Sequence, residues 1–213
     1  NADIDLVVTH DQISEYANFG KLIEEALEES RGPRLQHLVM IGAPTEGFTD
    51  DATFLALGES VDIRQIDEYR VGVSLRQPAI MMYTSGTTAN PKGCPLNHEV
   101  LVRNGFNMNR SRYFLDTKDR FWAPLPLFHM AAILPMLCCM DAGAALLSMV
   151  HVEPGLSLRM MEQEKVTVAF PSFPTIMQDL LNHPNFKKTD LSNLRRINNV
   201  APPDLLRHFQ EAL

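Results

Sequence analysis

The sequence predicts an α/β fold in which mostly parallel β-sheets are flanked by helices. Three observations support this fold class. Apolar runs of strand length alternate along the chain with longer segments of helical periodicity. Strands and helices follow one another in strict order, as expected when each helix returns the chain to a parallel neighbouring strand. Apolar residues make up 45% of the 213 residues, which is enough for a sizeable core.

The predicted elements of the first half include a β–α–β unit. In chain order they are a strand at 5–9, a helix at 13–30, a strand at 38–42, a short helix at 52–57, an extended connector at 66–69, a strand at 79–83 and a helix at 98–113. Gly32 and Pro33 stop the first long helix, and Asn97 is the N-cap of the last one.

The second half continues the alternation with shorter elements. In chain order they are a strand at 120–125, a helix at 130–140, a strand at 144–150, a helix at 156–165, a strand at 166–170, a helix at 174–182, a strand at 194–200 and a helix at 203–213. We therefore expect two α/β subdomains, residues 1–118 and residues 119–213, the second truncated at its C-terminal end.

Composition argues against several classes of protein. The net charge of −7 disfavours a nucleic-acid surface. Three cysteines, two of them adjacent at 138 and 139, form neither a disulfide framework nor a metal-binding pattern, and they suit a reducing cytoplasm. Residues 123–150 carry Asp141 as their only formal charge. Because prolines and Gly143 interrupt this stretch, we interpret it as a buried helix and strand rather than a membrane span.

One stretch carries the strongest functional signal. It follows a buried strand and reads Tyr83-Thr84-Ser85-Gly86-Thr87-Thr88-Ala89-Asn90-Pro91-Lys92-Gly93. Its hydroxyls and a compact cation suit phosphate, and its glycines allow close approach of a ligand to the backbone. The spacing excludes a Walker loop, because Lys92 is followed by Gly93 and Cys94. By composition alone, a polar surface turn is the alternative interpretation.

The order of these residues resembles the phosphate loop of the adenylate-forming superfamily, AMP-dependent ligases that include acyl-CoA synthetases. The resemblance implies that the phosphates of ATP are bound by Thr84, Ser85, Gly86, Thr87, Thr88 and Lys92. It also implies that the chain is an internal fragment of the large N-terminal domain of such a ligase. The segments that carry the magnesium-holding glutamate and the adenylation lysine of the family are not found in the 213 residues.

Further segments extend the resemblance. Pro126-Leu127-Phe128-His129-Met130 is similar to a family segment beside the acyl group, which implies substrate contacts for His129 and Met130. The alternative for His129 is a half-buried histidine bonded to a carbonyl. Phe173, in a segment similar to the family's Val-Pro-Thr, is a further candidate for the substrate pocket, with simple core packing as its alternative.

The adenine-binding turn is altered. The family usually has Gly-Gly-Ala-Pro, on which adenine rests, whereas this chain has Asn198-Asn199-Val200-Ala201-Pro202, in which the two glycines are not matched. Ala201 and Pro202 match and are assigned to nucleotide binding. Val200 carries a β-branched side chain where the backbone is expected to approach the ligand.

The resemblance implies a parent enzyme that joins a carboxylic acid to coenzyme A through an acyl-adenylate, using ATP and Mg²⁺. We expect the ion to be held mainly by the nucleotide and by residues absent here. No catalytic or metal-binding residue is assigned in this chain, which by itself is expected to be inactive and to self-associate. The alternative is a non-catalytic binding or interaction module derived from such a ligase. Fatty, aromatic and small acids all stay open, and a medium or large apolar acid is favoured by Met130, Ile133, Met136 and Phe173.

Overall fold

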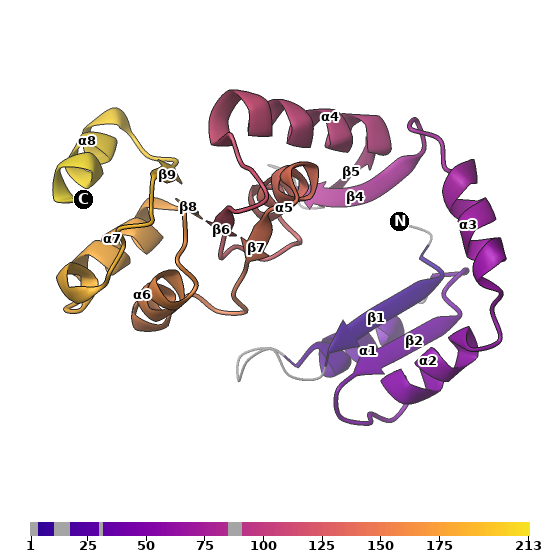
Figure 1. The fold of residues 1–213 in the computed structure, drawn as a ribbon. Coiled ribbons are helices and arrows are strands. Elements are labelled where there is room, and N and C mark those ends of the chain that lie inside the picture. The colour runs from indigo at the N-terminus through magenta and orange to yellow at the C-terminus, as the bar shows by residue number, and fades with distance from the viewer. Residues whose placement is uncertain (1–3, 11–17, 30–31, 85–90) are drawn as a thin grey trace. The chain divides into compact units, whose positions relative to one another are not determined.

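The computed structural model describes residues 4–10, 18–29, 32–84 and 91–213 (Figure 1). The chain divides into two compact units, residues 1–74 and residues 75–213. This division lies before the boundary at residue 118 that the sequence suggests, and that subdomain boundary stays a prediction.

The first unit is built on a three-stranded parallel sheet in the order β1 (Leu6–His10), β2 (His37–Ile41), β3 (Thr49–Asp50). Its helices are α1 (Phe19–Glu29), α2 (Asp51–Gly58) and α3 (Ile63–Gly72). The predicted extended connector at 66–69 is wrong, because these residues lie inside α3. Asp62 begins this helix as an N-cap, since its carboxylate accepts a hydrogen bond from the N–H of Arg64 at 2.9 Å.

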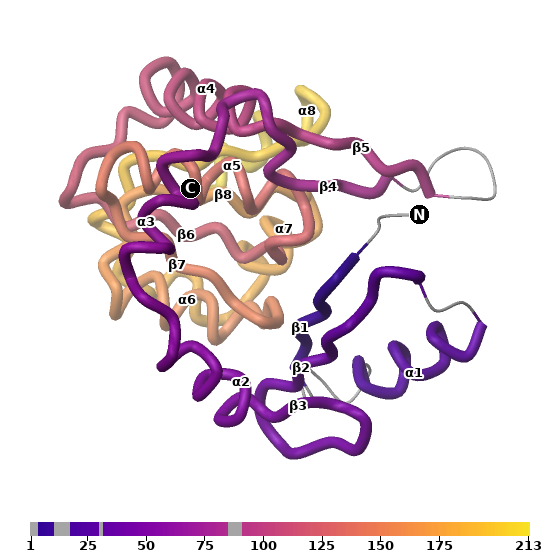
Figure 2. The backbone as a smooth tube through the Cα atoms, turned by 90° about the vertical axis from the view of Figure 1, so that its right-hand side faces the viewer, coloured from indigo at the N-terminus to yellow at the C-terminus, as the bar shows by residue number. Residues whose placement is uncertain are grey.

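The second unit begins with an antiparallel hairpin of β4 (Pro78–Thr84) and β5 (Lys92–Asn97), which leads into α4 (His98–Met108) (Figure 2). β5 was not predicted, and the expectation of a phosphate loop between a strand and a helix is wrong, because the segment lies between β4 and β5. Gly93 and Pro95 make this segment unlike a typical strand sequence, because both residue types are depleted in sheets. Proline is tolerated in a two-stranded ribbon, where one edge of each strand needs no hydrogen-bonded neighbour.

A four-stranded parallel sheet in the order β7-β6-β8-β9 forms the rest of the second unit (Figure 1). The elements that follow α4 are η1 (Asn109–Tyr113, a π-helix), β6 (Arg120–Trp122), α5 (Met130–Ala142), β7 (Ala145–Leu147), α6 (Pro154–Gln163), β8 (Val168–Ser172), α7 (Pro174–Asn182), η2 (Phe186–Lys188), β9 (Arg196–Asn199) and α8 (Pro203–Ala212). The predicted fold class is confirmed, with the hairpin as its antiparallel exception.

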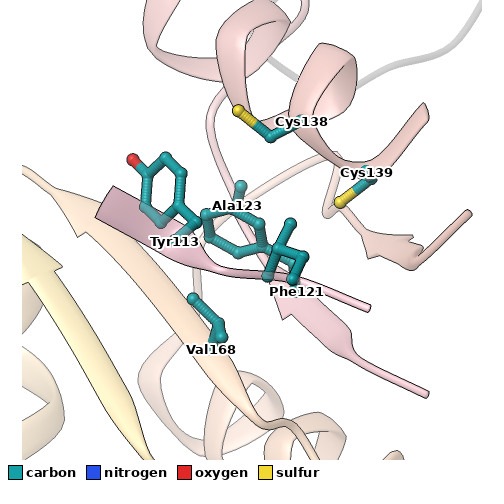
Figure 3. Packing of buried hydrophobic residues seen from close by; sticks show 7 residues of the cluster. Tyr113, Phe121, Ala123, Cys138, Cys139 and Val168 are labelled. Carbon is teal, nitrogen blue, oxygen red and sulfur yellow. The ribbon is translucent and has the colours of Figure 1, made fainter. Parts of the chain in front are cut away.

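Alternate residues of the central strands point to opposite faces of this sheet, so each face has its own core. Phe121 and Val168 pack with Tyr113 and the α5 residues Cys138 and Cys139 (Figure 3). The rings of Tyr113 and Phe121 lie 4.8 Å apart, centroid to centroid. Burial raises the pKa of both thiols to about 12, so they stay protonated at neutral pH and act as small apolar side chains.

The other core contains side chains from the sheet and from α6 and α7. Its buried members are Trp122, Met149, Leu158, Met161, Val166, Ala169 and Leu180. Trp122 is completely buried and makes the largest single contribution of volume. Because the central strands β6 and β8 are packed on both faces, ligands are expected at the ends of these strands and in the loops that follow them.

A buried carboxylate connects the amino ends of three strands. Asp119, just before β6, accepts hydrogen bonds from the Thr167 hydroxyl at 2.6 Å and from the Arg195 guanidinium at 2.6 Å. The N–H of Asp116 donates to the same carboxylate at 2.8 Å. Burial opposes its negative charge, but these hydrogen bonds together outweigh burial and lower the pKa of Asp119.

We expect Asp119→Asn to lower the free energy of unfolding by about 1.5–3 kcal/mol at pH 7, the range for a hydrogen bond to a charged group. A lowered pKa in the folded state stabilises the protein above the unfolded pKa of about 3.9, and this contribution is lost as the pH falls through the folded value. Urea unfolding at pH 7 and pH 3 measures it, with the exposed Asp179→Asn as control. An equal loss at both pH values would contradict a role for the charge.

Candidate functional site

The predicted phosphate loop connects the two strands of the β4–β5 hairpin. Thr84, at the end of β4, pairs directly with Lys92, at the start of β5. Opposed residues of an antiparallel pair project to one face, with Cβ atoms about 4.5–5.5 Å apart. The hydroxyl of Thr84 and the ammonium of Lys92 are therefore brought to the same face, and both residues are exposed. Ser85, Gly86, Thr87 and Thr88 lie outside the described residues.

Gly93 has a packing role in this hairpin. A Cβ atom at this position would lie 3.0 Å from Sδ of Met81 and 3.3 Å from the ring of Tyr83. The glycine thus lets these two side chains cover one face of the ribbon. We had expected Gly93 to let the backbone approach a ligand, and packing is a sufficient physical reason for glycine here.

The remaining predicted site residues follow three adjacent strands of the parallel sheet. His129 and Met130 come after β6, Phe173 comes after β8, and residues 201–202 come after β9. Because the paired strands run parallel, their carboxyl ends meet at one edge of the sheet, where α/β folds bind ligands. The topology therefore brings the three segments to a common edge.

His129 is exposed and forms the N-cap of α5, where its Nδ1 atom accepts a hydrogen bond from the N–H of Ala131 at 3.1 Å. This contact differs from the carbonyl-bonded, half-buried histidine that was the alternative. Nε2 is left to contact a ligand or solvent. Met130 begins the helix and is half-buried.

Phe173 precedes α7, and 48% of its surface is exposed, so simple core packing does not describe it. Ala201 is half-buried and Pro202 is exposed directly before α8. Val200 is 63% exposed, which shows that its side chain occupies open space beside the altered turn. The ligand roles of these residues stay predictions.

An apolar cleft of about 470 Å³ links the hairpin to the segment before α5. It is lined by Ile80, Met81, Met82, Tyr83, Leu127, Phe128, Ile133 and Met136. Of the four residues that favoured an apolar acid, Ile133 and Met136 line this cleft, while Met130 and Phe173 are not among its lining residues. The sequence analysis did not single out Tyr83 or Phe128, although each directly precedes a predicted site residue.

Two amide donors are buried near the end of β9, just before the predicted adenine turn. Within the described part of the chain, Nδ2 of Asn198 and Nδ2 of Asn199 are buried and make no hydrogen bond. Oδ1 of Asn198 accepts from Nε of Arg112 at 3.2 Å, and Oδ1 of Asn199 accepts from the N–H of Val200 at 2.9 Å. Both side chains are therefore held through their oxygens at the end of β9.

No group of three or more His, Cys, Asp or Glu side chains in residues 4–10, 18–29, 32–84 and 91–213 is arranged to hold a metal ion. Over the same residues, no helix combines the length and apolar character that a bilayer crossing requires.

Comparison with known proteins identifies relatives of the whole chain. A family model described as "AMP-binding enzyme" matches residues 1–213. The putative acyl-CoA synthetase YngI of Bacillus subtilis is 34% identical over 173 residues, which cover 79% of this chain. A mitochondrial medium-chain acyl-CoA ligase of Rattus norvegicus, ACSF2, is 30% identical over 200 residues, or 85% of this chain. The chain spans 31% of the length of each of these relatives.

Solved structures agree with the fold. The N-terminal domain of FACL13 from Mycobacterium tuberculosis superposes with a TM-score of 0.75 at 21% identity, covering 99% of this chain and 48% of that one. The anthranilate CoA ligase AuaEII gives a TM-score of 0.72 at 23% identity, covering 99% and 39%. With a family match over all 213 residues, the chain belongs to the AMP-binding enzymes of the adenylate-forming superfamily, and its fold is part of their N-terminal domain.

Proposed function

We propose that the protein carrying this sequence activates a carboxylic acid with ATP and transfers the acyl group to coenzyme A. The observation that carries the proposal is the pairing of Thr84 with Lys92 at the two ends of the phosphate-loop segment. A hydroxyl donor and a cation on one face suit the oxygens of a polyphosphate. The acyl-CoA synthetases among the relatives support the same chemistry.

The reaction consists of two substitutions. A carboxylate oxygen attacks the α-phosphorus of ATP and pyrophosphate leaves, which gives an acyl-adenylate. The thiol of coenzyme A then attacks the acyl carbon, and AMP leaves. Positioning and charge neutralisation carry most of such phosphoryl chemistry. We assign Thr84 and Lys92 to the β- and γ-phosphates, together with the hydroxyls of residues 85, 87 and 88.

We further propose that the acid is apolar and of medium or large size. The cleft beside the hairpin is lined by apolar side chains and has a volume of about 470 Å³, within the common range for small-molecule sites. It adjoins Thr84 through Tyr83 and His129 through Phe128. One relative is a medium-chain acyl-CoA ligase, which fits this class of acid.

A second candidate is a non-catalytic binding module that has kept the scaffold and lost turnover. It is favoured by Asn199 and Val200, which stand where adenine usually rests on two glycines. Exchange of labelled pyrophosphate into ATP, measured on the complete protein with a panel of acids, separates the two. Acid-dependent exchange supports the ligase. Saturable ATP binding without exchange for any acid supports the binding module.

For the ligase, we expect Lys92→Ala to lower the rate of acyl-adenylate formation about 10- to 150-fold, because a charge-assisted hydrogen bond contributes about 1.5–3 kcal/mol. Single-turnover formation of the adenylate measures this effect, and circular dichroism verifies the fold. Lys118→Ala, which removes another exposed lysine, is the matched control. An unchanged rate in Lys92→Ala would remove Lys92 from the site.

The capping and substrate roles of His129 can be separated. We expect His129→Ala to lower the free energy of unfolding by about 1 kcal/mol, because the cap of α5 is lost, whereas His129→Asn supplies a capping oxygen and keeps the stability. If His129 also contacts the acid, both variants raise the KM for the acid. Thermal unfolding and steady-state kinetics measure the two effects, and a normal KM in His129→Asn would leave capping as the only role.

Four earlier expectations stay predictions. Magnesium is proposed to be bound mainly through the phosphates of the nucleotide. A cytoplasmic location is proposed from the cysteine content, and the 213-residue chain by itself is proposed to be inactive. Self-association of that chain is proposed from exposed apolar side chains in residues 134–150 and in α8, where Met140, Val150 and Leu206 are exposed by 71%, 76% and 38%. The expectation that Phe209 of α8 is exposed as well is wrong, because only 3% of its surface is accessible. Light scattering is expected to give a mass above 24.0 kDa that rises with concentration, and a constant monomer mass would contradict this.

A further inference from the structure

Ser172, at the carboxyl end of β8, adopts a backbone conformation that L-amino acids rarely take. Its φ is +64°, and the N–H of Phe173 donates a hydrogen bond to the carbonyl of Pro171 at 2.8 Å. A bond across three residues with positive φ at the centre describes the rarer, strained form of the γ-turn. Ser172 is 6% exposed, so the strained residue lies inside the protein rather than in a surface loop.

The surrounding chain enforces this turn. The register between β8 and β9 passes from Ala169↔Ile197 to Ser172↔Asn199, so two residues of β8 oppose a single residue of β9. This bulge contains Pro171, which lacks an N–H and interrupts the ladder. Pro174 fixes the chain on the other side, at the first position of α7.

The same turn is attached to the end of β9. The carbonyl of Ser172 accepts a hydrogen bond from the N–H of Val200 at 3.1 Å. Oδ1 of Asn199 accepts from this N–H as well, at 2.9 Å. The direction of the chain into Ala201 and Pro202 is therefore fixed by contacts with Ser172 and Asn199. Strained residues that their surroundings hold in place are concentrated at functional sites.

We propose that Ser172 is a positioning residue, whose strained turn aims Phe173 and the turn at residues 200–202 along the ligand-binding edge of the sheet. The inference rests on the proposed function for its ligands, an apolar acid and ATP. The positioning depends on the positive φ of Ser172, a backbone conformation that a Cβ atom disfavours. The hydroxyl of Ser172 is not required.

Three variants of the complete protein separate these elements. Ser172→Ala keeps a Cβ atom and removes the hydroxyl, Ser172→Gly adopts a positive φ without strain, and Ser172→Thr keeps the hydroxyl but adds a β-branch that disfavours a positive φ. We expect Ser172→Thr to raise the KM for the acid about threefold to tenfold, as when an ordered aromatic side chain must be immobilised on binding, with kcat unchanged within about twofold. In Ser172→Gly the KM is expected to be unchanged, and the melting temperature is expected to stay the same or to rise by up to about 4 °C, because strain is relieved.

Amide hydrogen exchange supplies a readout that does not depend on turnover. In Ser172→Thr, the amides of Phe173 and Val200 are expected to exchange at least about tenfold faster than in the wild-type protein, in Ser172→Ala and in Ser172→Gly. The amide of Leu180, buried within α7, serves as an internal reference and is expected to be unchanged. Ser172→Ala is expected to match the wild-type protein in KM.

Each outcome decides the proposal. Unchanged exchange at Phe173 and Val200 in Ser172→Thr overturns it, as does an unchanged KM for the acid in an active Ser172→Thr protein. An equal rise of KM in Ser172→Ala also overturns it, since the hydroxyl is then the contact. If the complete protein forms no acyl-adenylate with any acid, the proposed function fails, and exchange at the two amides alone supports or overturns the positioning role.

Discussion

The parallel pairing of β6, β8 and β9 is the constraint on which the candidate site depends. Parallel strands end at the same edge of a sheet. The segments that follow β6, β8 and β9 therefore lie at one edge although they are far apart in sequence. Burial on both faces, by Phe121 and Val168 on one side and Trp122 on the other, holds the strands in register. A register shift of one residue would turn each of these side chains towards the wrong core.

Hydrogen bonds connect all three strands at their amino ends and connect β8 with β9 at the carboxyl ends, with different chemistry at each. At the amino ends, Asp119 accepts hydrogen bonds from Thr167 and Arg195, the residues just before β8 and β9. At the carboxyl ends, Ser172 and Val200 are joined through the backbone. The charged network stabilises the fold, whereas the backbone hydrogen bond fixes the path of the chain at the edge where ligands are proposed to bind. Positive φ values occur near both ends, at Phe114 and Lys165 before β6 and β8 and at Ser172 at the end of β8.

Much of the second unit could be predicted from the sequence, because its helices combine clear periodicity with proline and N-cap signals. The helix predicted at 174–182 has these same bounds in α7, and α5 begins at Met130 as expected. The predictions failed where those signals are weak. β5 contains Gly93 and Pro95, and α3 exposes Ile63 and Tyr69, so neither shows the buried pattern of its class.

The candidate site was only partly predictable, for a related reason. The order of residues from Thr84 to Lys92 marked a phosphate loop, but the direct pairing of these two residues needs β5, which the sequence did not reveal. Serine in the left-handed region has no sequence signal of its own. Pro171 and Pro174 on either side of Ser172 are the only local hint, and they indicate a fixed path without giving the sign of φ.

The central claim is that a carboxylate attacks the α-phosphorus of ATP in the protein that carries this chain. Incubation with ATP, Mg²⁺, coenzyme A and an apolar acid labelled with ¹⁸O in both carboxyl oxygens tests it most directly. The account predicts that mass spectrometry finds one ¹⁸O atom in the AMP released and one retained in the thioester. Label in inorganic phosphate together with unlabelled ADP, or no label in any nucleotide product, would contradict it.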